Sequence, residues 1–484
     1  MEYSIINYSQ IITDGSLRID AEHYKNEYFR IKKLLVKNKS QELLSFIDRP
    51  VMTGHTPSMK NEKFYGGNVN FIKTDNLREH YIEGAFTHKL SEEGNKKIKR
   101  SSLKENDVLV TIIGATFQIV GRACLIKKKD LPANINQNIA LIRVSKKISP
   151  EYLTVYLNSY YGRNYLWYLS RQTEQVNLNC REVEQLLVPV LSGNLIELIG
   201  ELHKKAYSLY EKADELFQEA EQILLSEFNL LNWKPKHRIS FVKKYSDTQS
   251  AERIDAEYFQ PMYEEIVKAI TTSKDHACLG DLASIKKCIE PGSEAYQESG
   301  IAFLRVSNLS KFGIKDGNQQ YISEDLYRTI KQHQPKKNEI LLSKDATPGI
   351  AYYLKDEPEK MIPSGGILRL KVKDEDKLYP EYLTLVLNSV IVQKQIERDA
   401  GGSIINHWLV DQVKNTLIPI LPIAKQQKIA EIVNGSFCNR ELSKRLLETA
   451  KRGVELAIEK DERQAQKWID EESKKLTIYN KKAV

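Results

Sequence analysis

Apolar residues recur at alternating spacings of four and three along one stretch near the middle of the chain. This alternation is typical of a helix that packs in a coiled coil. Its positions are Leu195, Ile199, Leu202, Ala206, Leu209, Ala213, Leu216, Ala220 and Ile223. They cover about 29 residues, or roughly 43 Å at 1.5 Å per residue. We therefore predict a long helix over residues 194–229.

A looser apolar stripe, mostly with four-residue spacing, predicts a second long helix over residues 422–462. Its positions are Ile429, Val433, Phe437, Leu442, Leu446, Ala450, Val454 and Ile458. An apolar stripe on a helix needs a partner, and the nearest partner is the other stripe of the same chain. We expect the two helices to form an antiparallel coiled coil, with pairing between two chains as the alternative. The densely charged residues 463–484 are expected to form a solvated extension or tail.

Short runs rich in β-branched residues stand before each long helix. VNFIKTD at 69–75 and DVLVTIIGA at 107–115 are bounded by Gly or Asn, and IALIRV at 139–144 and ILRLKV at 367–372 have a similar composition. Such runs predict strands. A short helix is expected after each PEYLT sequence. The pattern predicts a mixed fold of the α/β (α+β) class.

The same order of patterns occurs twice, with an offset of 230–235 residues. A repeat of this length exceeds a solenoid unit of about 20–50 residues and indicates a duplicated domain. The predicted parts are two globular domains at 1–193 and 241–421, each followed by its long helix, with a linker at 230–240 and pseudo-two-fold symmetry. The matching pairs are RIDAE at 18–22 and 253–257, FIKTDNL at 71–77 and FLRVSNL at 303–309, NDVLVT at 106–111 and NEILLS at 338–343, PEYLTVYLNS at 150–159 and PEYLTLVLNS at 380–389, VPV at 188–190 and IPI at 418–420, and IGEL at 199–202 and IAEI at 429–432.

Composition narrows the class of protein only slightly. The chain has 484 residues with 72 basic and 64 acidic side chains, a net charge of +8 that is compatible with a polyanionic partner. Five cysteines at irregular spacing, without a CxxC pair, indicate neither a disulfide framework nor a zinc site. No apolar run approaches the length of a membrane span, and no secretory signal is recognisable. These features predict a cytoplasmic protein without membrane contact.

Sequence patterns of catalysis are missing. There is no HExxH, no GxxxxGK[ST] phosphate loop, no GxSxG elbow and no Pro-Pro pair of the kind found in amino-methyltransferases. We therefore expect no catalytic residue, no metal ligand and no cofactor in this chain.

Nucleic-acid binding is the chemistry that the polar residues support best. The segment GNKKIKRSSLK at 94–104 carries several basic residues and no acidic one, so it is either a solvated loop or a phosphate contact. Polar residues at 73–76, and at equivalent places in 305–308, can offer donors and acceptors to base edges. The amide-rich INQN at 135–138 fits either a turn or a base contact. The second half has MIPSGG at 361–366 there, as expected for two modules that read different sequences.

The ordered set of motifs resembles the specificity subunit of type I restriction–modification systems, over nearly the whole chain. The similar segments are TGHTPS at 53–58, YGG at 65–67, FIKTDNL at 71–77, GATFQIVGRACLI at 114–126, INQN at 135–138, RQTEQVNLNCREVEQLLVPV at 171–190 and AGGSIINHWLVDQVKNTLIPILPIAKQQKIAEIV at 400–433. The second half departs from the first at EPGSEAYQESGIAFLRVSNL (290–309), and its ATPGIAYYL stretch (346–354) is shorter.

The resemblance implies a non-catalytic subunit with two target-recognition domains, each of which reads one part of a bipartite, asymmetric site on double-stranded DNA. The paired helices would set the gap between the two parts. Two modification subunits would bring S-adenosylmethionine and methylate adenine N6. Restriction subunits would bring ATP and Mg²⁺ and cleave the DNA.

The expected DNA contacts combine this resemblance with the polar chemistry of base edges. In the first domain they are Thr56, Ser58, Lys73, Thr74, Asn76, Gln118, Arg122, Gln137 and Asn138. In the second they are Ser293, Tyr296, Arg305, Ser307, Asn308, Lys344 and Thr347.

Two other functions stay open at this point. One is the recognition subunit of a related system whose partner fuses the methyltransferase and the nuclease. The other is a coiled-coil scaffold that does not bind DNA.

Overall fold

The computed structural model describes residues 6–9, 11, 21–84, 86, 88–171, 176–273, 275–315, 317, 319–401 and 406–483. The chain forms two units, and each combines small sheets with part of two long helices. The first unit comprises residues 1–210 and 441–484, and the second comprises residues 211–440. Both boundaries fall inside long helices, so each unit contains a part of each. The sequence repeat instead predicts one whole long helix for each half.

The first unit contains a four-stranded antiparallel sheet and a three-stranded sheet. The four strands have the order β2 (Met52–Thr53), β9 (Ile139–Ile142), β5 (Val108–Thr111), β7 (Ala123–Leu125), and the three have the order β4 (Lys89–Leu90), β3 (Tyr65–Ile72), β8 (Ala133–Ile135). Strand β3 is antiparallel to β4 and parallel to β8. Two short pairs complete the sheets: β1 (Gln41–Glu42) with β11 (Leu187–Val188), and β6 (Ile113–Gly114) with β10 (Val176–Asn177).

The second unit repeats the strand order of the two larger sheets and the first of the two short pairs. Its four-stranded sheet has the order β13 (Ala283–Lys287), β21 (Ile367–Val372), β18 (Ile340–Ser343), β19 (Ala351–Tyr353), and its three-stranded sheet has the order β17 (Gln320–Ile322), β14 (Ile301–Leu304), β20 (Met361–Pro363). Strand β14 is antiparallel to β17 and parallel to β20. The short pairs are β12 (Asp275–Cys278) with β22 (Leu417–Ile420), and β15 (Leu309–Ser310) with β16 (Gly313–Ile314). The shared strand order shows that the sequence repeat is a duplicated fold.

Short helices cover the sheets. Helix α4 lies against β5 and β7, and α12 lies against β19. Those of the first unit are α2 (Asn26–Lys37), α3 (Glu92–Lys97), α4 (Pro150–Asn158), α5 (Tyr160–Leu169) and α6 (Cys180–Glu184). Those of the second unit are α8 (Tyr245–Ala251), α9 (Pro261–Ser273), α10 (Leu279–Leu282), α11 (Glu324–Ile330), α12 (Pro380–Asn388), α13 (Val390–Asp399) and α14 (Val410–Asn415). Each PEYLT sequence forms the start of its helix and does not precede it as predicted, with Pro150 or Pro380 in the first turn, where a missing N–H costs nothing.

The repeated NDVLVT and NEILLS sequences form the same turn and the same ion pair. Asn106 and Asn338 both have left-handed backbones, with φ of 68° and 64°, a conformation that asparagine tolerates better than most residues. The carboxylate that follows each asparagine is buried. Asp107 accepts two hydrogen bonds from Arg143 at 2.6 Å, and Glu339 lies 3.4 Å from Arg369. This pairing explains why an acidic residue begins an otherwise apolar strand.

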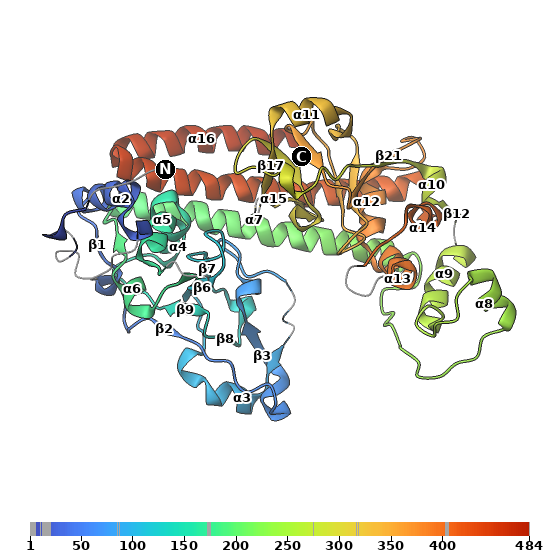
Figure 1. Ribbon diagram of the computed structural model, residues 1–484, viewed down its shortest axis with the longest axis horizontal. Coiled ribbons are helices and arrows are strands. Elements are labelled where there is room, and N and C mark those ends of the chain that lie inside the picture. Colours follow the sequence, from blue (N-terminus) through green and yellow to red (C-terminus); the bar gives the residue numbers. More distant parts are fainter. Residues whose placement is uncertain are drawn as a thin grey trace. The chain divides into compact units, whose positions relative to one another are not determined.

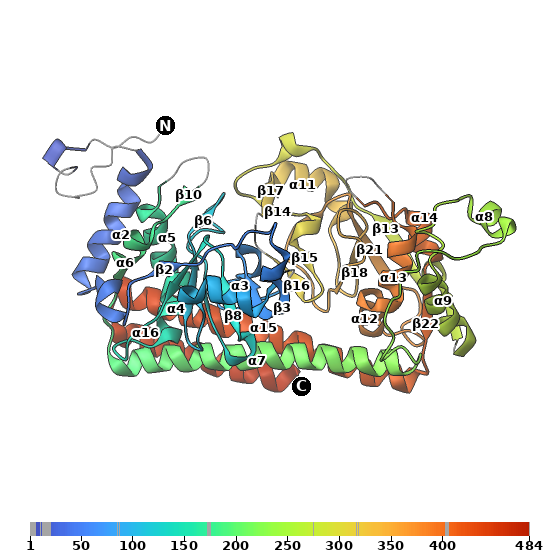
Figure 2. The same cartoon turned by 90° about the horizontal axis from the view of Figure 1, so that it is seen from below.

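Two long helices extend through both units and pair in antiparallel directions in each. Helix α7 (Gly193–Ser226) and helix α15 (Ile423–Glu459) lie side by side in both ribbon views (Figure 1, Figure 2). In the first unit the Oγ of Ser443 donates to the carbonyl of Ala206 at 2.6 Å. In the second unit the Oγ of Ser436 donates to the carbonyl of Ala213 at the same distance. The predicted antiparallel coiled coil is confirmed within the single chain.

Most of the heptad residues named from the sequence are buried, while Leu209, Leu216, Ile223 and Phe437 are half-buried. Helix α7 also buries a second stripe that the heptad pattern did not include. Its residues are His203, Tyr207, Tyr210, Phe217 and Leu224. A helix that contacts a second helix and also a globular domain needs a buried face wider than one heptad seam.

The charged C-terminal segment is not a tail. It forms helix α16 (Glu462–Ala483), which folds back on α15, so that a Cβ at Gly453 would lie only 2.5 Å from Ile469. Ala465, Ile469 and Leu476 are buried in the core of the first unit. The expectation of a solvated extension is therefore corrected. None of the described helices is long and apolar enough to cross a membrane.

Candidate nucleic-acid interface

In the first unit, backbone and side-chain hydrogen bonds join the loops that carry the predicted DNA contacts. Thr56 donates to the Oε1 of Gln137 at 2.6 Å and connects the loop after β2 with the loop after β8. The amide of Asn136 donates to Ile72 at the end of β3. Gly54 permits this close approach, because a Cβ there would overlap the carbonyl of Ile135. The loops thus form one connected surface.

The second unit brings the equivalent loops together in the same way. The amide of Lys344, after β18, donates to Gly366 before β21, and the amide of Ser364 donates to Leu304 at the end of β14, both at 2.8 Å. A Cβ at Gly366 would lie 2.9 Å from Val306. Glycine therefore allows the loop before β21 to contact the short helical turn after β14.

The predicted residues differ in how much of their surface is exposed to solvent. Those that are exposed are Ser58, Gln118, Gln137, Ser293, Ser307 and Thr347. Those that are half-buried are Thr56, Lys73, Thr74, Arg122, Asn138, Tyr296, Arg305 and Lys344. Asn76 and Asn308 are buried, with 8% and 0% of their surface exposed.

For Asn76 and Asn308 the predicted base contact is corrected to a structural role. The Oδ1 of Asn76 accepts the amide of Lys73 at 3.0 Å, and that of Asn308 accepts the amide of Arg305 at 3.1 Å. The Nδ2 of Asn308 also donates to the carbonyls of Lys315 and Gly317. Both residues hold a 3-10 turn in shape. We call these two segments, 73–76 and 305–308, the reading turns, after the base contacts that the sequence predicts for them.

Three further predicted residues already have intramolecular partners. Arg122 donates to the carbonyls of Leu77 and Gln118 at 2.8 and 3.0 Å, and burial together with the nearby Arg78 lowers the pKa of its guanidinium. The hydroxyl of Tyr296 donates to Glu290. Lys344 pairs with Asp345 at 2.5 Å. For Arg122 these bonds connect the end of the first reading turn to the loop after β6, which favours a positioning role.

His407 and Asp345 lie on this surface but were not predicted. The Nδ1 of His407 is 2.8 Å from the carboxylate of Asp345, and more than half of the His407 side chain is exposed. The backbones of His407 and Asp345 also pair, and in the first unit the equivalent backbone pair is Asn177 with Ile113. The alignment of the two repeats at an offset of 230 residues could have identified this position. It shows that the halves differ in chemistry where their folds agree.

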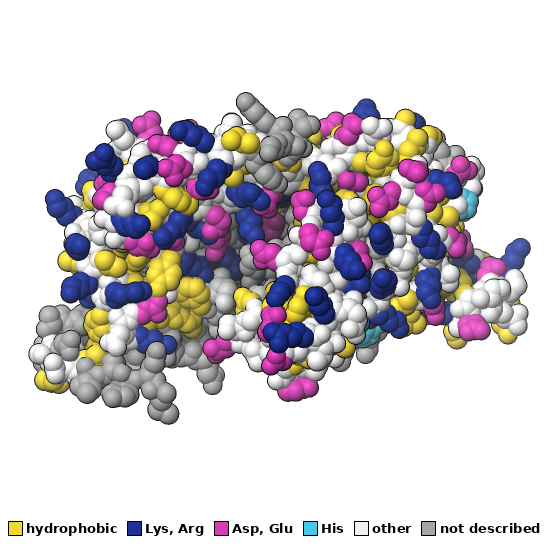
Figure 3. Space-filling model, turned by 90° about the horizontal axis from the view of Figure 1, so that it is seen from above, with side chains coloured by type: hydrophobic (Ala, Val, Ile, Leu, Met, Phe, Trp, Pro, Cys, Tyr) yellow, Lys and Arg dark blue, Asp and Glu magenta, His cyan; other side chains and the backbone are white. Residues whose placement is uncertain are grey.

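The basic side chains of the segment 94–104, which sequence analysis singled out, are exposed. Lys96, Lys97, Lys99, Arg100 and Lys104 are all exposed, in α3 and the turns that follow it. On the face shown in Figure 3, Lys and Arg side chains are interspersed with Asp and Glu rather than gathered in one field. The exposed lysine and arginine side chains of the basic segment are able to contact phosphates.

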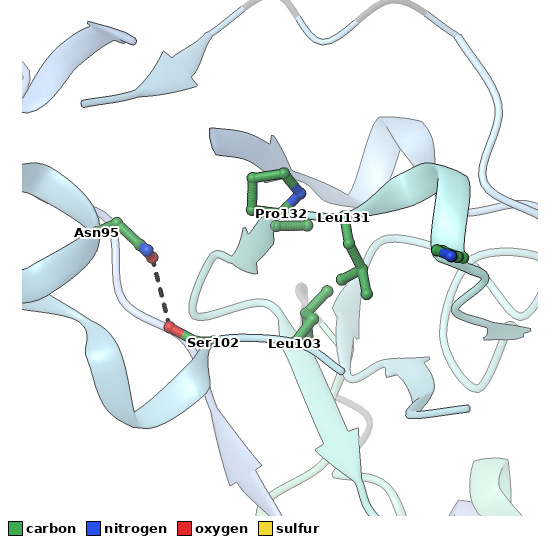
Figure 4. Close-up of a pocket in the computed structure, with 7 residues that line it drawn as sticks. Asn95, Ser102, Leu103, Leu131 and Pro132 are labelled. Carbon is green, nitrogen blue, oxygen red and sulfur yellow. Dashed lines mark hydrogen bonds between the residues drawn. The ribbon is translucent and has the colours of Figure 1, made fainter. Parts of the chain in front are cut away.

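An open hollow beside the basic segment does not resemble a catalytic site. Leu103, Leu131 and Pro132 line it, together with Asn95 and Ser102, whose side chains hydrogen-bond to each other (Figure 4). In the described part of the chain, no three His, Cys, Asp or Glu residues come close enough to hold a metal ion. The polar groups of the connected loops fit hydrogen bonding to a nucleic acid better than chemistry on a small molecule.

A comparison with family models gives a match in the second half of the chain. Residues 274–452 match the model described as the type I restriction modification DNA specificity domain. This range holds the sheets of the second unit and most of α15. A curated relative is the type I restriction enzyme EcoBI specificity subunit of Escherichia coli, which is 28% identical over 125 residues, or 26% of this chain. The match spans 25% of that relative's length.

Solved structures with similarity include the S subunit of a type I restriction–modification system from M. genitalium. It is 12% identical, with a TM-score of 0.36, and the match covers 89% of this chain and 95% of that one. The HsdS subunit from Thermoanaerobacter tengcongensis is 14% identical, with a TM-score of 0.26, and the match covers 89% and 95% of the two chains.

Proposed function

Residues 274–452 carry a type I restriction modification DNA specificity domain, and from this premise we propose that the whole chain is the DNA-recognition subunit of such a system. The observation that supports this most strongly is the repeated topology. In their four-stranded and three-stranded sheets, the unit that holds the matched domain and the first unit have the same strand order and the same parallel and antiparallel pairs. A second copy of a DNA-reading fold implies a second DNA site.

In this proposal each unit reads one part of a bipartite DNA site. Exposed side chains such as Gln118 and Gln137 in the first unit, and Ser307 and Thr347 in the second, contact base edges or phosphates. Because the loops of the two units carry different residues, the two parts of the site differ. Helices α7 and α15 set the distance between the parts. At 1.5 Å per residue a helix of this length is about 50 Å long, the same order as the 34–36 Å turn of B-DNA.

The chemistry belongs to partners in this proposal. Two modification subunits supply S-adenosylmethionine and methylate adenine, and restriction subunits supply ATP-dependent cleavage. This chain supplies neither a nucleophile nor a cofactor site. Its contribution is to carry both recognition surfaces in one chain, which costs less entropy on binding than bringing together two separate chains.

The experiment that tests the proposal is single-molecule mapping of methylated adenines in cells that express this chain with its modification partner. The expected result is a split motif with a fixed unspecified gap. Replacing Ser307 and Thr347 with alanine should alter only the part of the motif read by the second unit. The matched control replaces Gln118 and Gln137 and should alter only the other part.

The outcomes separate the alternatives. A partner that proves to be a fused methyltransferase and nuclease would assign the chain to the related kind of system. No methylation, with a modification partner that is active beside another recognition subunit, would contradict the proposal. Purified chain that is not retained on duplex DNA at low salt would then favour a scaffold.

A further inference from the structure

In both units the segment that follows the reading turn packs against the long helices. In the first unit this segment is residues 78–83, and in the second it is residues 310–315, which include most of the hairpin of β15 and β16. We call these two segments the anchor loops. Each lies entirely within one unit, and each contacts both α7 and α15.

The first anchor loop is fixed by three consecutive residues. Tyr81 stacks on Tyr210 of α7, with ring centroids 3.9 Å apart, and its hydroxyl is 2.8 Å from the Oγ of Ser443 on α15. His80 packs against His203 of α7, with ring centroids 5.4 Å apart. The carboxylate of Glu79 lies 3.4 Å from the Nζ of Lys451 on α15. Only 9% of Tyr81 is exposed, and the residue contacts α7 through its ring and α15 through its hydroxyl.

The second anchor loop uses different residues for the same contacts. Phe312 meets Phe217 of α7 edge to face, with ring centroids 5.0 Å apart. The guanidinium of Arg440, on α15, lies 4.3 Å from the centre of the Phe312 ring and pairs with Asp214 of α7 at 2.5 Å. Lys311 lies 4.4 Å from the centre of the Phe217 ring. Aromatic and cation–aromatic contacts of this kind have preferred geometries, so they fix orientation as well as proximity.

Hydrogen bonds join each anchor loop to its reading turn. The amide of Glu83 donates to the carbonyl of Asn76 at 2.9 Å, and the amide of Lys315 donates to the carbonyl of Asn308 at 2.7 Å. The buried side chain of Asn308 donates back to Lys315. A rotation of an anchor loop on its helices would therefore carry the reading turn with it.

We propose that Tyr81 and Phe312 are positioning residues that set the orientation of each reading turn on the helix pair, and thereby how strictly the gap in the DNA site is enforced. This inference rests on the proposed function. The helices fix a length, but a module that could tilt on them would accept sites with longer or shorter gaps. The anchor loops remove that freedom.

The test uses the full complex in cells and a plasmid library in which the native half-sites flank gaps one base pair shorter or longer than the native gap. Variants Tyr81→Leu and Phe312→Leu are compared with Tyr327→Leu. Tyr327 is buried to a similar extent in a separate cluster around Phe303. The quantity measured is the ratio of methylation at native-gap sites to methylation at altered-gap sites.

The expected result is a ratio lowered about fivefold to tenfold by Tyr81→Leu and by Phe312→Leu, the size of one aromatic pair interaction. Tyr327→Leu should leave the ratio unchanged. Tyr81→Phe, which keeps the aromatic ring, should also have the wild-type ratio. Half-site sequences should stay the same in every variant.

An unchanged ratio with methylation reduced equally at all gaps would overturn the inference, because the anchor loops would then only support folding. If Tyr81→Leu abolishes methylation, Phe312→Leu decides the question, since Phe312 is only half-buried and a leucine there is tolerated. Failure of the proposed function is recognised separately: wild-type complex would then show no split motif at all.

Discussion

Asn308 shows how a residue with the right chemistry for a base contact can serve the fold instead. Its side chain makes three hydrogen bonds to the main chain and has no exposed surface. The sequence FLRVSNL alone cannot reveal this, because the partners of the amide are backbone groups whose positions depend on the fold. The neighbouring Ser307 is exposed, so the two residues can be separated by experiment.

We predict that Asn308→Ala lowers the free energy of unfolding by about 1–3 kcal/mol, because it leaves buried backbone groups without partners. Ser307→Ala should change stability by less than about 0.5 kcal/mol. Denaturant titration of the purified chain measures both. Equal stability of the two variants would show that the turn does not depend on the amide.

The buried histidines of the first unit predict a dependence on pH. His80 and His203 are 2% and 0% exposed, and none of their four ring nitrogens has a hydrogen-bond partner among the described residues. Burial holds the pKa of both rings well below the usual value, and the nearby Lys451 and Lys127 lower the pKa of His80 and His203, respectively, still further.

In the unfolded chain these rings bind protons near pH 6.5, whereas in the folded chain they stay neutral. Their contribution to stability is therefore complete above about pH 6.5 and is lost as the pH falls below that value. We predict that the double variant His80→Asn, His203→Phe loses less stability between about pH 7.5 and pH 5 than wild type. Thermal unfolding across this range measures the difference. The exposed His55→Asn should behave as wild type.

At the scale of elements, the heptad pattern predicted the long helices and their pairing, but not all of their buried surface. The stripe of His203, Tyr207, Tyr210 and Phe217 lies beside the heptad positions and faces the globular parts. A heptad describes only the contact between helices, so a helix with a second contact buries more than the pattern shows. Helix α16 was missed because its buried positions are few and are separated by many charged residues.

The antiparallel pair gives a prediction about length. Ser443 lies against Ala206 and Ser436 against Ala213, so the point after Tyr210 in α7 corresponds to the point after Cys438 in α15. Insertion of seven residues at both points keeps the heptad phase and lengthens the pair by about 10 Å. We predict a gap about three base pairs longer, with both half-sites unchanged, by methylated-adenine mapping.

Insertion into α7 alone is the control. It leaves the two helices unequal and should reduce methylation at all gap lengths. A doubled insertion that retained the native gap would show that the helices do not determine the spacing.

At the scale of the whole molecule, the net charge of +8 is small for a chain of this size, and binding to DNA must depend on where the charges lie. The exposed run of Lys96, Lys97, Lys99 and Arg100 gathers basic residues near the three-stranded sheet of the first unit. Sequence analysis left this run open between a solvated loop and a phosphate contact.

We predict that replacing these four residues with glutamine reduces the slope of log Kobs against log salt, by about 0.9 for each phosphate that the variant no longer neutralises. Affinity should fall similarly for specific and unrelated duplexes, because phosphates carry no sequence. Fluorescence anisotropy over a salt series measures both. The matched control replaces the exposed Lys467, Lys474 and Lys475 of α16 and should leave the slope unchanged.

The division of the chain into units has a consequence for synthesis on the ribosome. The core of the first unit includes Leu446, Val454 and Ile469, which are translated about 230 residues after the part that ends at Tyr210. At roughly 5–20 residues per second the N-terminal segment waits on the order of 10–50 seconds for the helices that complete it. The second unit is continuous in sequence, so all of its residues are synthesised before residues 441–484 complete the first unit. The synthesis of residues 441–484 therefore completes the folding of the first unit. Until then, the heptad face of α7 in this unit is exposed to chaperones and to neighbouring nascent chains.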